Sequence, residues 1–236
     1  MTKFAIFAHA RSGSTSLATV IDASPDVKMA IEPFHPEYSK WNPNEPDYSS
    51  IIKDKISMNK ALEELFSKYN AIKVLQYQFS DEIYIELLKR KAIKILFLRR
   101  KDYLAGVISG LIAEQTNVWK KDDIKTKVDY SKLKPLSISR AKKMLTYVSE
   151  QMEFYEDFLR ENRKGEYLKI YYEELFSEDQ MQNLEKIQRI RKFLEIKPPD
   201  SEVIEKYMTP SQTQINDKGD YRKIPNYQEI MNTFTR

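Results

Sequence analysis

Close to the N-terminus an apolar run, Phe4 to Ala8, ends at a short loop of small and hydroxyl-bearing residues that leads directly into a helical pattern. In a parallel α/β sheet, such a turn directs several free backbone N–H groups and the positive end of the helix at one position, which suits a phosphate or sulfate group. Gly13, one of five glycines, lets the backbone approach such a ligand, and Arg11 offers a planar, bidentate oxyanion contact. Hydroxyl donors come from Ser12, Ser14, Thr15 and Ser16.

This loop differs from the two common nucleotide motifs. A triphosphate P-loop reads GxxxxGK[ST], whereas here Ser14 follows Gly13 and no lysine comes after it. A dinucleotide fingerprint needs further glycines at the turn. The simpler alternative is an ordinary strand-to-helix turn with a serine N-cap, which any α/β protein requires.

Five short apolar or β-branched runs alternate with helical patterns along the chain. This alternation predicts a parallel sheet flanked by helices, an α/β, P-loop-like three-layer fold formed by residues 1–236 as a single domain. Two irregular polar stretches, 41–57 and 117–134, are candidate lid loops. The expected strands are Phe4 to Ala8, Val27 to Ile31, Ala71 to Leu75, Ile93 to Leu98 and Tyr167 to Tyr171.

Composition excludes several classes of protein. The 39 basic and 35 acidic residues leave a net charge of +4, too small to favour nucleic acid as a partner. No cysteine is present, so disulfides and thiolate metal sites are excluded and a cytoplasmic location is the default expectation. With two histidines and no ligand cluster, we expect no metal. No apolar stretch approaches the roughly 18 residues that a membrane span needs, so we expect no integral membrane segment.

Polar residues follow three of the expected strands, where ligands bind in open α/β sheets. The first strand is followed by the loop just described, the second by Glu32 to His35, and the fourth by Arg99 to Asp102. Three consecutive cations favour a ligand with several negative charges, such as a phosphate-bearing cofactor. The next helix, from Asp102 to Ile112, brings Ser109 near this edge, although a small packing residue is the simpler interpretation of Ser109 alone.

These motifs resemble those of sulfotransferases that use 3′-phosphoadenosine 5′-phosphosulfate, especially the bacterial carbohydrate sulfotransferases that include trehalose 2-sulfotransferase. HARSGSTSL is similar to the family's 5′-phosphosulfate loop, and RRKDYLAGVIS to its 3′-phosphate motif. Glu32-Pro33, EQTNVW and YLKIYYEEL resemble three further family elements, so the resemblance covers about Phe4 to Leu175.

The resemblance implies roles for individual residues. Arg11, Ser12, Gly13, Ser14 and Thr15 would contact the 5′-phosphosulfate, with Ser16 as a further donor of the same loop, while Arg100 and Ser109 would hold the 3′-phosphate. The tail 216–223 faintly resembles the segment that closes over the cofactor, which makes Lys218 and Arg222 candidate ligands; an exposed charged tail is the alternative. Arg11 stands where cytosolic family members usually carry lysine, which argues against a steroid or phenol acceptor.

The implied reaction is an in-line displacement in which an acceptor hydroxyl attacks sulfur and adenosine 3′,5′-bisphosphate leaves. Glu32 is the expected general base, with His35 as the second candidate, and Arg11 would neutralise charge on the leaving phosphate. The alternative is that Glu32 only forms a structural ion pair with Arg11 or Arg100. The scheme requires no metal.

Two other functions remain open. A P-loop-type small-molecule kinase would share the fold and first loop, but the loop lysine and a Mg²⁺-binding acid after a strand are missing. A non-catalytic binding module could retain the anion cradle without turnover. The acceptor, expected to be a small molecule, carbohydrate or glycolipid, depends on loop shapes, and the oligomeric state is open as well.

Overall fold

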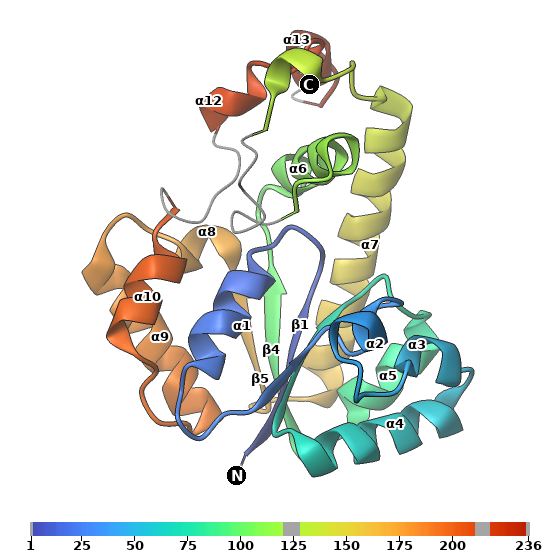
Figure 1. The fold of residues 1–236 in the computed structure, drawn as a ribbon, viewed down its shortest axis with the longest axis vertical. Helices are drawn as coiled ribbons and strands as arrows, with labels where there is room; N and C mark the ends of the chain where they lie inside the picture. The colour runs from blue at the N-terminus through green and yellow to red at the C-terminus, as the bar shows by residue number, and fades with distance from the viewer. Residues whose placement is uncertain (1, 120–127, 211–217, 235–236) are drawn as a thin grey trace.

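The protein is described by a computed structural model that covers residues 2–119, 128–210 and 218–234 (Figure 1). Its centre is a five-stranded sheet in which every strand pairing is parallel. The strand order is β2-β3-β1-β4-β5. The predicted α/β fold with a parallel sheet is therefore confirmed, and the strands are β1 (Lys3–Ala8), β2 (Met29–Ile31), β3 (Ala71–Leu75), β4 (Ile93–Arg99) and β5 (Tyr167–Tyr171).

The first strand occupies the middle of the sheet, with Phe7 paired to Val74 of β3 on one side and to Phe97 of β4 on the other. From β1 the chain crosses β3 to reach β2, whereas from β4 it moves outward in the opposite direction to β5. Ligands of open α/β sheets bind where connections diverge in this way, at the carboxyl ends of the strands. The topology thus brings the segments after β1, β3 and β4 to one edge, called the carboxyl edge below.

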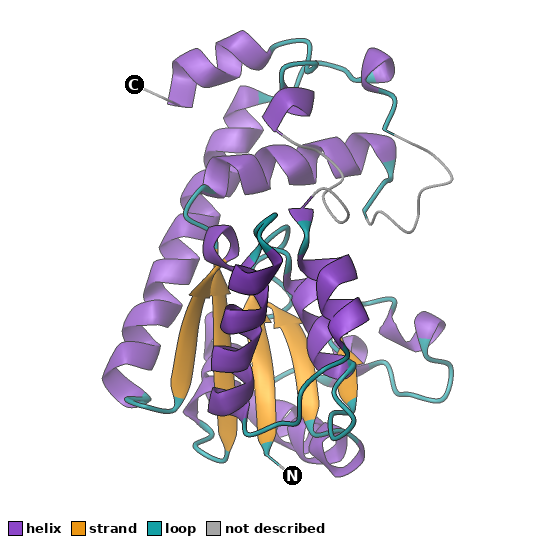
Figure 2. Ribbon diagram, turned by 90° about the vertical axis from the view of Figure 1, so that its left-hand side faces the viewer, coloured by secondary structure: helices purple, strands orange, loops and turns teal. Residues whose placement is uncertain are grey.

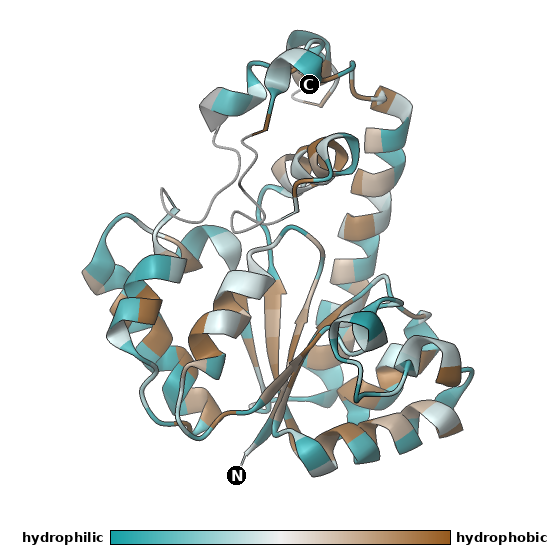
Figure 3. Cartoon of the chain, viewed as in Figure 1, coloured by the Kyte–Doolittle hydropathy of each residue, from teal (hydrophilic) through white to brown (hydrophobic). Residues whose placement is uncertain are grey.

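Helices cover both faces of the sheet (Figure 1). Alternate residues of β1 point to opposite faces, so that Ile6 joins one apolar cluster and Phe7 the other. Phe7 packs edge-on against Tyr84 and Tyr155, at centroid distances of 5.2 and 4.8 Å, and Figure 3 shows the apolar strands between the two layers. The helices on the Ile6 side are α1 (Ser14–Asp22), α8 (Tyr172–Leu175), α9 (Gln180–Leu194) and α10 (Ser201–Met208); those on the Phe7 side are α4 (Lys55–Lys68), α5 (Asp81–Lys89) and α7 (Ile138–Asn162).

A further group of elements lies beyond the carboxyl edge, where α6 crosses above the strands (Figure 2). The C-terminal segment packs onto this group: the Asn226 side chain bonds to both the N–H and the carbonyl of Leu136, each at 2.9 Å. The Tyr221 hydroxyl donates to the carbonyl of Ala105 in α6, at 3.3 Å. These elements are α6 (Tyr103–Thr116), the 3₁₀ turn η1 (Tyr130–Lys132), α12 (Lys218–Tyr221) and α13 (Tyr227–Phe234).

The stretch 41–57 is not the long irregular loop that its composition suggests. It begins at the last residue of α2 (Tyr38–Trp41), contains α3 (Tyr48–Ile51) and ends inside α4. Tyr48 is buried, and its hydroxyl donates to Glu64 of α4 at 3.1 Å. The sequence reasoning failed here because it used proline and asparagine as loop signals and missed a buried aromatic anchor. The segment is fixed to α4, although its suggested role as a lid stays a prediction.

Candidate functional site

The loop between β1 and α1 has the geometry expected of an anion cradle. Gly13 is the N-cap of α1, with a left-handed φ of 75°, and no side chain caps the helix. The N–H groups of the first turn therefore emerge at the carboxyl edge without a side-chain acceptor of their own. The Ser12 hydroxyl is fully buried and donates to the carbonyl of His9 at 2.7 Å, so it closes the loop. Ser14 is buried and Ser16 half-buried at the start of the helix.

Gly13 is required for two reasons. Its φ lies in the left-handed region, which disfavours side chains. A Cβ atom at this position would also approach Phe176 to 2.4 Å and Tyr172 to 2.9 Å. The segment after β5 thus presses directly on the anion loop and leaves no room for a larger residue.

Arg11 joins the loop to α6. Its backbone is left-handed, with φ of 61°, and its Nε donates to the Ser109 hydroxyl at 3.0 Å. Its Nη1 donates to the carbonyl of Trp119 at 2.7 Å, while Nη1 of Arg100 donates to the carbonyl of Arg11 itself at 2.8 Å. Two glycines of α6 face these arginines: a Cβ on Gly106 would lie 3.4 Å from Arg100 Cδ and one on Gly110 3.8 Å from Arg11 Cγ, both ordinary van der Waals distances. The structure therefore brings together Arg11, Arg100 and Ser109, which the sequence assigned to one cofactor.

Arg100 is held from the opposite side by the segment that follows β5. Its guanidinium lies over the Tyr172 ring, 4.4 Å from the centroid, and its Nε is 3.8 Å from a Glu173 oxygen. The same Glu173 carboxylate accepts the backbone N–H groups of Lys101 and Asp102, at 2.9 and 3.0 Å. Arg100 therefore connects the turn before α6 with the anion loop.

Glu32 lies at the end of β2 with a left-handed φ of 55° and pairs with the ammonium of Lys73. Backbone strain of this kind concentrates at functional sites. Lys73 is 1% exposed, and its Nζ also donates to Thr15 Oγ1 in the first turn of α1, at 3.4 Å. The partner of Glu32 is thus Lys73 rather than Arg11 or Arg100. The buried ammonium of Lys73 links Glu32, the candidate base, to the first turn of α1.

Sequence reasoning missed Lys73. The available signal was its position as the one charged residue within the apolar strand AIKVL. A buried lysine is costly unless it is paired, so a lysine in a central strand indicates a specific partner.

His35 lies on the segment after β2, where its ring stacks on that of Trp41, with centroids 4.6 Å apart. Its Nδ1 accepts the N–H of Glu37 at 3.1 Å. Its role as the second candidate base stays a prediction.

His9 is buried against α6 on the other side of the loop. Its Nδ1 donates to the carbonyl of Ala10 at 2.8 Å, and its ring lies 5.2 Å from that of Tyr103. Burial, together with the charges of Arg100 and Arg99, lowers the pKa of His9 to about 4. The imidazole is therefore neutral at pH 7.

This pKa predicts an acid-sensitive fold. In the unfolded chain His9 takes up a proton below a pKa of about 6.5, whereas in the folded chain it does so only near pH 4. The contribution of neutral His9 to the free energy of unfolding is therefore complete above pH 6.5 and decreases as the pH falls. The loss between those values should reach about 3 kcal/mol. Denaturant unfolding across this range should show a free energy of unfolding that depends more steeply on pH in wild type than in His9→Gln. The same dependence on pH in both proteins would contradict the prediction.

The C-terminal segment contacts the site through Tyr221, which was not among the predicted residues. Arg222 is exposed after α12, and the side chain of Lys218 and residues 216–217 lie outside the described part. Tyr221 is buried instead, and its hydroxyl lies near Ser109, Arg11 and Arg100. Lys223 covers the Tyr130 ring at 5.1 Å, which joins the tail to the segment 117–134, of which 120–127 lie outside the described residues.

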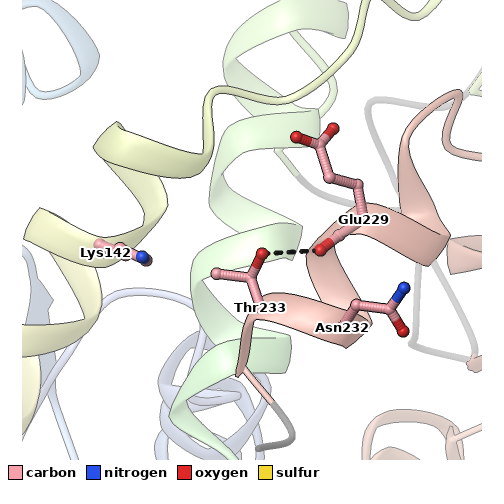
Figure 4. A pocket seen from close by; sticks show the side chains of 4 residues that line it. All are labelled: Lys142, Glu229, Asn232 and Thr233. Carbon is pink, nitrogen blue, oxygen red and sulfur yellow. Dashed lines mark hydrogen bonds between the residues drawn. The ribbon is translucent and has the colours of Figure 1, made fainter.

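Within residues 2–119, 128–210 and 218–234, no three His, Asp or Glu side chains group as a metal site would require, and no helix is long and apolar enough to cross a membrane. A shallow polar pocket lies between α7 and α13, where Lys142 points toward Thr233, Asn232 and Glu229 (Figure 4). None of the predicted site residues lines it.

Comparisons with known proteins give distant structural similarities only. No protein-family model and no curated protein sequence matches the chain. A mouse sulfotransferase solved in complex with PAP matches 89% of this chain at 13% identity and a TM-score of 0.49, and the match spans 64% of the mouse chain. A sulfotransferase from Alicyclobacillus acidocaldarius matches the full length at 16% identity and the same TM-score, over 96% of its own chain.

Proposed function

We propose that the protein is a sulfotransferase that moves the sulfuryl group of 3′-phosphoadenosine 5′-phosphosulfate to a hydroxyl of a small-molecule or carbohydrate acceptor. The observation that carries the proposal is the linkage of Glu32, Lys73 and Thr15, which joins a carboxylate to the uncapped start of α1. An anion held on α1 would therefore lie beside a carboxylate able to take a proton. The sequence motifs support the same reaction.

The proposed roles follow from the contacts. The first-turn N–H groups of α1 and the guanidinium of Arg11 would hold the 5′-phosphosulfate and neutralise the leaving phosphate. Arg100 and Ser109, which adjoin Arg11, would contribute to the 3′-phosphate site. Glu32 would accept the proton of the attacking hydroxyl, and Lys73 would orient Glu32 and add positive charge near the transferred group. The cofactor itself supplies an activated sulfuryl group.

One observation supports the alternative of a small-molecule kinase. Lys73 brings an ammonium to Thr15, and so supplies from β3 the cation that the loop sequence lacks. ATP is therefore the proper competitor in any binding test.

Calorimetry with adenosine 3′,5′-bisphosphate tests the proposal without knowledge of the acceptor. We expect micromolar binding that weakens roughly 10- to 100-fold in Arg11→Ala, because a charge-assisted contact to the anion is lost. Arg100→Ala should weaken binding too. Arg189→Ala, an exposed arginine of α9, is the matched control and should bind like wild type. Tighter binding of ATP would favour the kinase, and binding of neither ligand would refute both.

A further inference from the structure

The outer face of α7 carries two aromatic side chains that are open to solvent. Tyr147 is 48% exposed and Phe154 is 45% exposed. About two helical turns separate them, so both side chains emerge on one face of the helix. Met152, two residues before Phe154, is fully buried, and two residues correspond to about 200° of rotation. The face with the two rings therefore points away from the core, and α7 lies at the margin of the molecule in Figures 1 and 2.

The charges of α7 oppose the dipole of the helix. Its first half contains three cations and no acid, whereas its second half, from residue 150 onward, contains five acids and one arginine. An isolated helix is stabilised by the opposite order, with acids near the N-terminus and cations near the C-terminus. All these charged residues except Glu156 are exposed. Within the described residues, the ion pairs of α7 include neither Lys143 nor Glu161 and are formed by Arg140, Glu156, Asp157 and Arg160.

The rings and the charges both become complementary when two copies of α7 pack antiparallel about a two-fold axis. An interface with this symmetry requires one patch that matches itself. When Tyr147 lies opposite Phe154 of the second copy, Phe154 lies opposite Tyr147 in turn, and two aromatic pairs form at the centre. The same register places Arg140 at one end opposite Glu161 at the other. The basic half of each helix then lies along the acidic half of the other.

Lys143 fits the same register in detail. It faces a hole formed by residues at the spacing i, i+3, i+4 and i+7, as in knobs-into-holes packing. In the second copy these residues are Phe154, Asp157, Phe158 and Glu161. The ammonium of Lys143 would meet two carboxylates, while its methylene stem covers aromatic rings. The second copy thus supplies the counter-charges that Lys143 and Glu161 lack within the described residues.

The size of this contact fits a reversible dimer. From Arg140 to Glu161 the helix is about 32 Å long, at about 1.5 Å per residue. Obligate dimers usually bury about 2,000 Å² or more, which is more than one pair of helices of this length provides. Association in the micromolar range is therefore expected.

We infer that the outer face of α7 is a homodimer interface, which packs antiparallel on the same face of a second copy of this chain. Tyr147 and Phe154 form its centre, and the oppositely charged halves of the two helices set the orientation and register.

Charge reversal separates this role from a role in folding. Arg140→Glu/Lys143→Glu makes the exposed face acidic throughout, and Asp157→Lys/Glu161→Lys makes it basic. Each double variant should dimerise at least roughly tenfold more weakly, because like charges then face each other across the axis. Both variants bring α7 into agreement with its dipole, so the fold should persist. The matched control is a double reversal at two exposed cations of α9, Arg189→Glu/Lys192→Glu.

Mixing the two variants provides the decisive comparison. An acidic and a basic helix face each other with opposite charges at both ends, so the mixture should form a heterodimer although neither variant dimerises well alone. A general loss of structure would not be restored by mixing. Sedimentation velocity from low to high micromolar concentration measures this, and added salt should weaken the association.

We expect a concentration-dependent dimer for wild type and the α9 control, mainly monomer for each α7 variant, and a dimer in their mixture. Wild type that stays monomeric throughout would overturn the inference and leave the face to solvent or to a different protein. A dimer that both reversals leave unchanged would place the contact elsewhere on the molecule. Failure of the mixture to associate would contradict the antiparallel register.

A single cysteine tests the position of the axis. In the inferred register Glu150 lies next to the two-fold axis, where each residue meets its own copy. The chain has no cysteine, so Glu150→Cys introduces the only thiol. Mild oxidation should give a covalent dimer, since a disulfide forms only between close Cα atoms. Glu153→Cys, exposed but turned away from the aromatic face, is the control, and equal cross-linking of the two variants would contradict the register.

Discussion

Glu32→Gln is expected to lower the rate of sulfuryl transfer roughly 10²- to 10⁴-fold, the usual contribution of a general base. The amide keeps the size of the carboxylate and can still accept a hydrogen bond from Lys73, so the fold should persist. It cannot take a proton from an acceptor hydroxyl at neutral pH. The effect should fall on kcat, since affinity for adenosine 3′,5′-bisphosphate depends on the loop and on Arg11.

Glu37→Gln is the matched control for this variant. Glu37 lies five residues further along the same segment and forms an exposed pair with Lys40. Its replacement should change neither turnover nor stability measurably, because exposed ion pairs contribute little. A Glu32→Gln enzyme that folds and works within threefold of wild type would show that Glu32 is not the base.

Arg163→Leu is expected to reduce the free energy of unfolding by about 3 to 5 kcal/mol. Arg163 is 1% exposed and donates to the carbonyls of Leu88 and Ile93, each at 2.6 Å, and of Arg90 at 3.0 Å. Its Nε also pairs with Glu166, at 2.7 Å. Leucine would leave these carbonyls buried without donors, where α5, β4 and α7 meet.

Arg160→Leu provides the comparison in denaturant unfolding. Arg160 lies in the last turn of α7, three residues before Arg163, which is the C-cap of that helix. The pair of Arg160 with Asp157 is exposed, so we expect a change below about 1 kcal/mol. An equal loss of unfolding free energy in the two variants would mean that the buried carbonyl contacts of Arg163 stabilise the fold no more than an exposed ion pair does. Arg163 is distant from the carboxyl edge, so binding of adenosine 3′,5′-bisphosphate should survive wherever Arg163→Leu remains folded.

The strands were predictable because each is a short apolar run with a definite end. The expected strand Ala71 to Leu75 agrees with β3 residue for residue. The spacing of apolar residues predicts a long helix from about Ser139 to Asn162, and α7 begins one residue earlier, at Ile138. Helix starts are harder to predict: Ser177 and Gln180 have the spacing of a capping box, yet α9 begins at Gln180 with Asp179 as its N-cap. Several side chains compete for each helix start, and tertiary packing decides between them.

The candidate site was predictable where it depends on chain order and unpredictable where it depends on distant contacts. Arg11 and Ser109 meet because α6 follows a strand adjacent to β1, which strand-end reasoning captures. The pairing of Glu32 with Lys73 required the register of β2 against β3, which no local pattern encodes. Likewise Tyr221 is an unremarkable tail residue until the C-terminal segment packs on α6.

The contact of Phe176 and Tyr172 with Gly13 has a consequence for biosynthesis. The loop is translated first, but the rings that confine it come about 160 residues later, and translation proceeds at about 5 to 20 residues per second. Arg100 depends on the same late segment for its aromatic support. A ribosome-bound chain that ends before β5 therefore lacks the wall of this loop, and the anion affinity that we propose for the loop would arise only after the segment behind β5 has been translated.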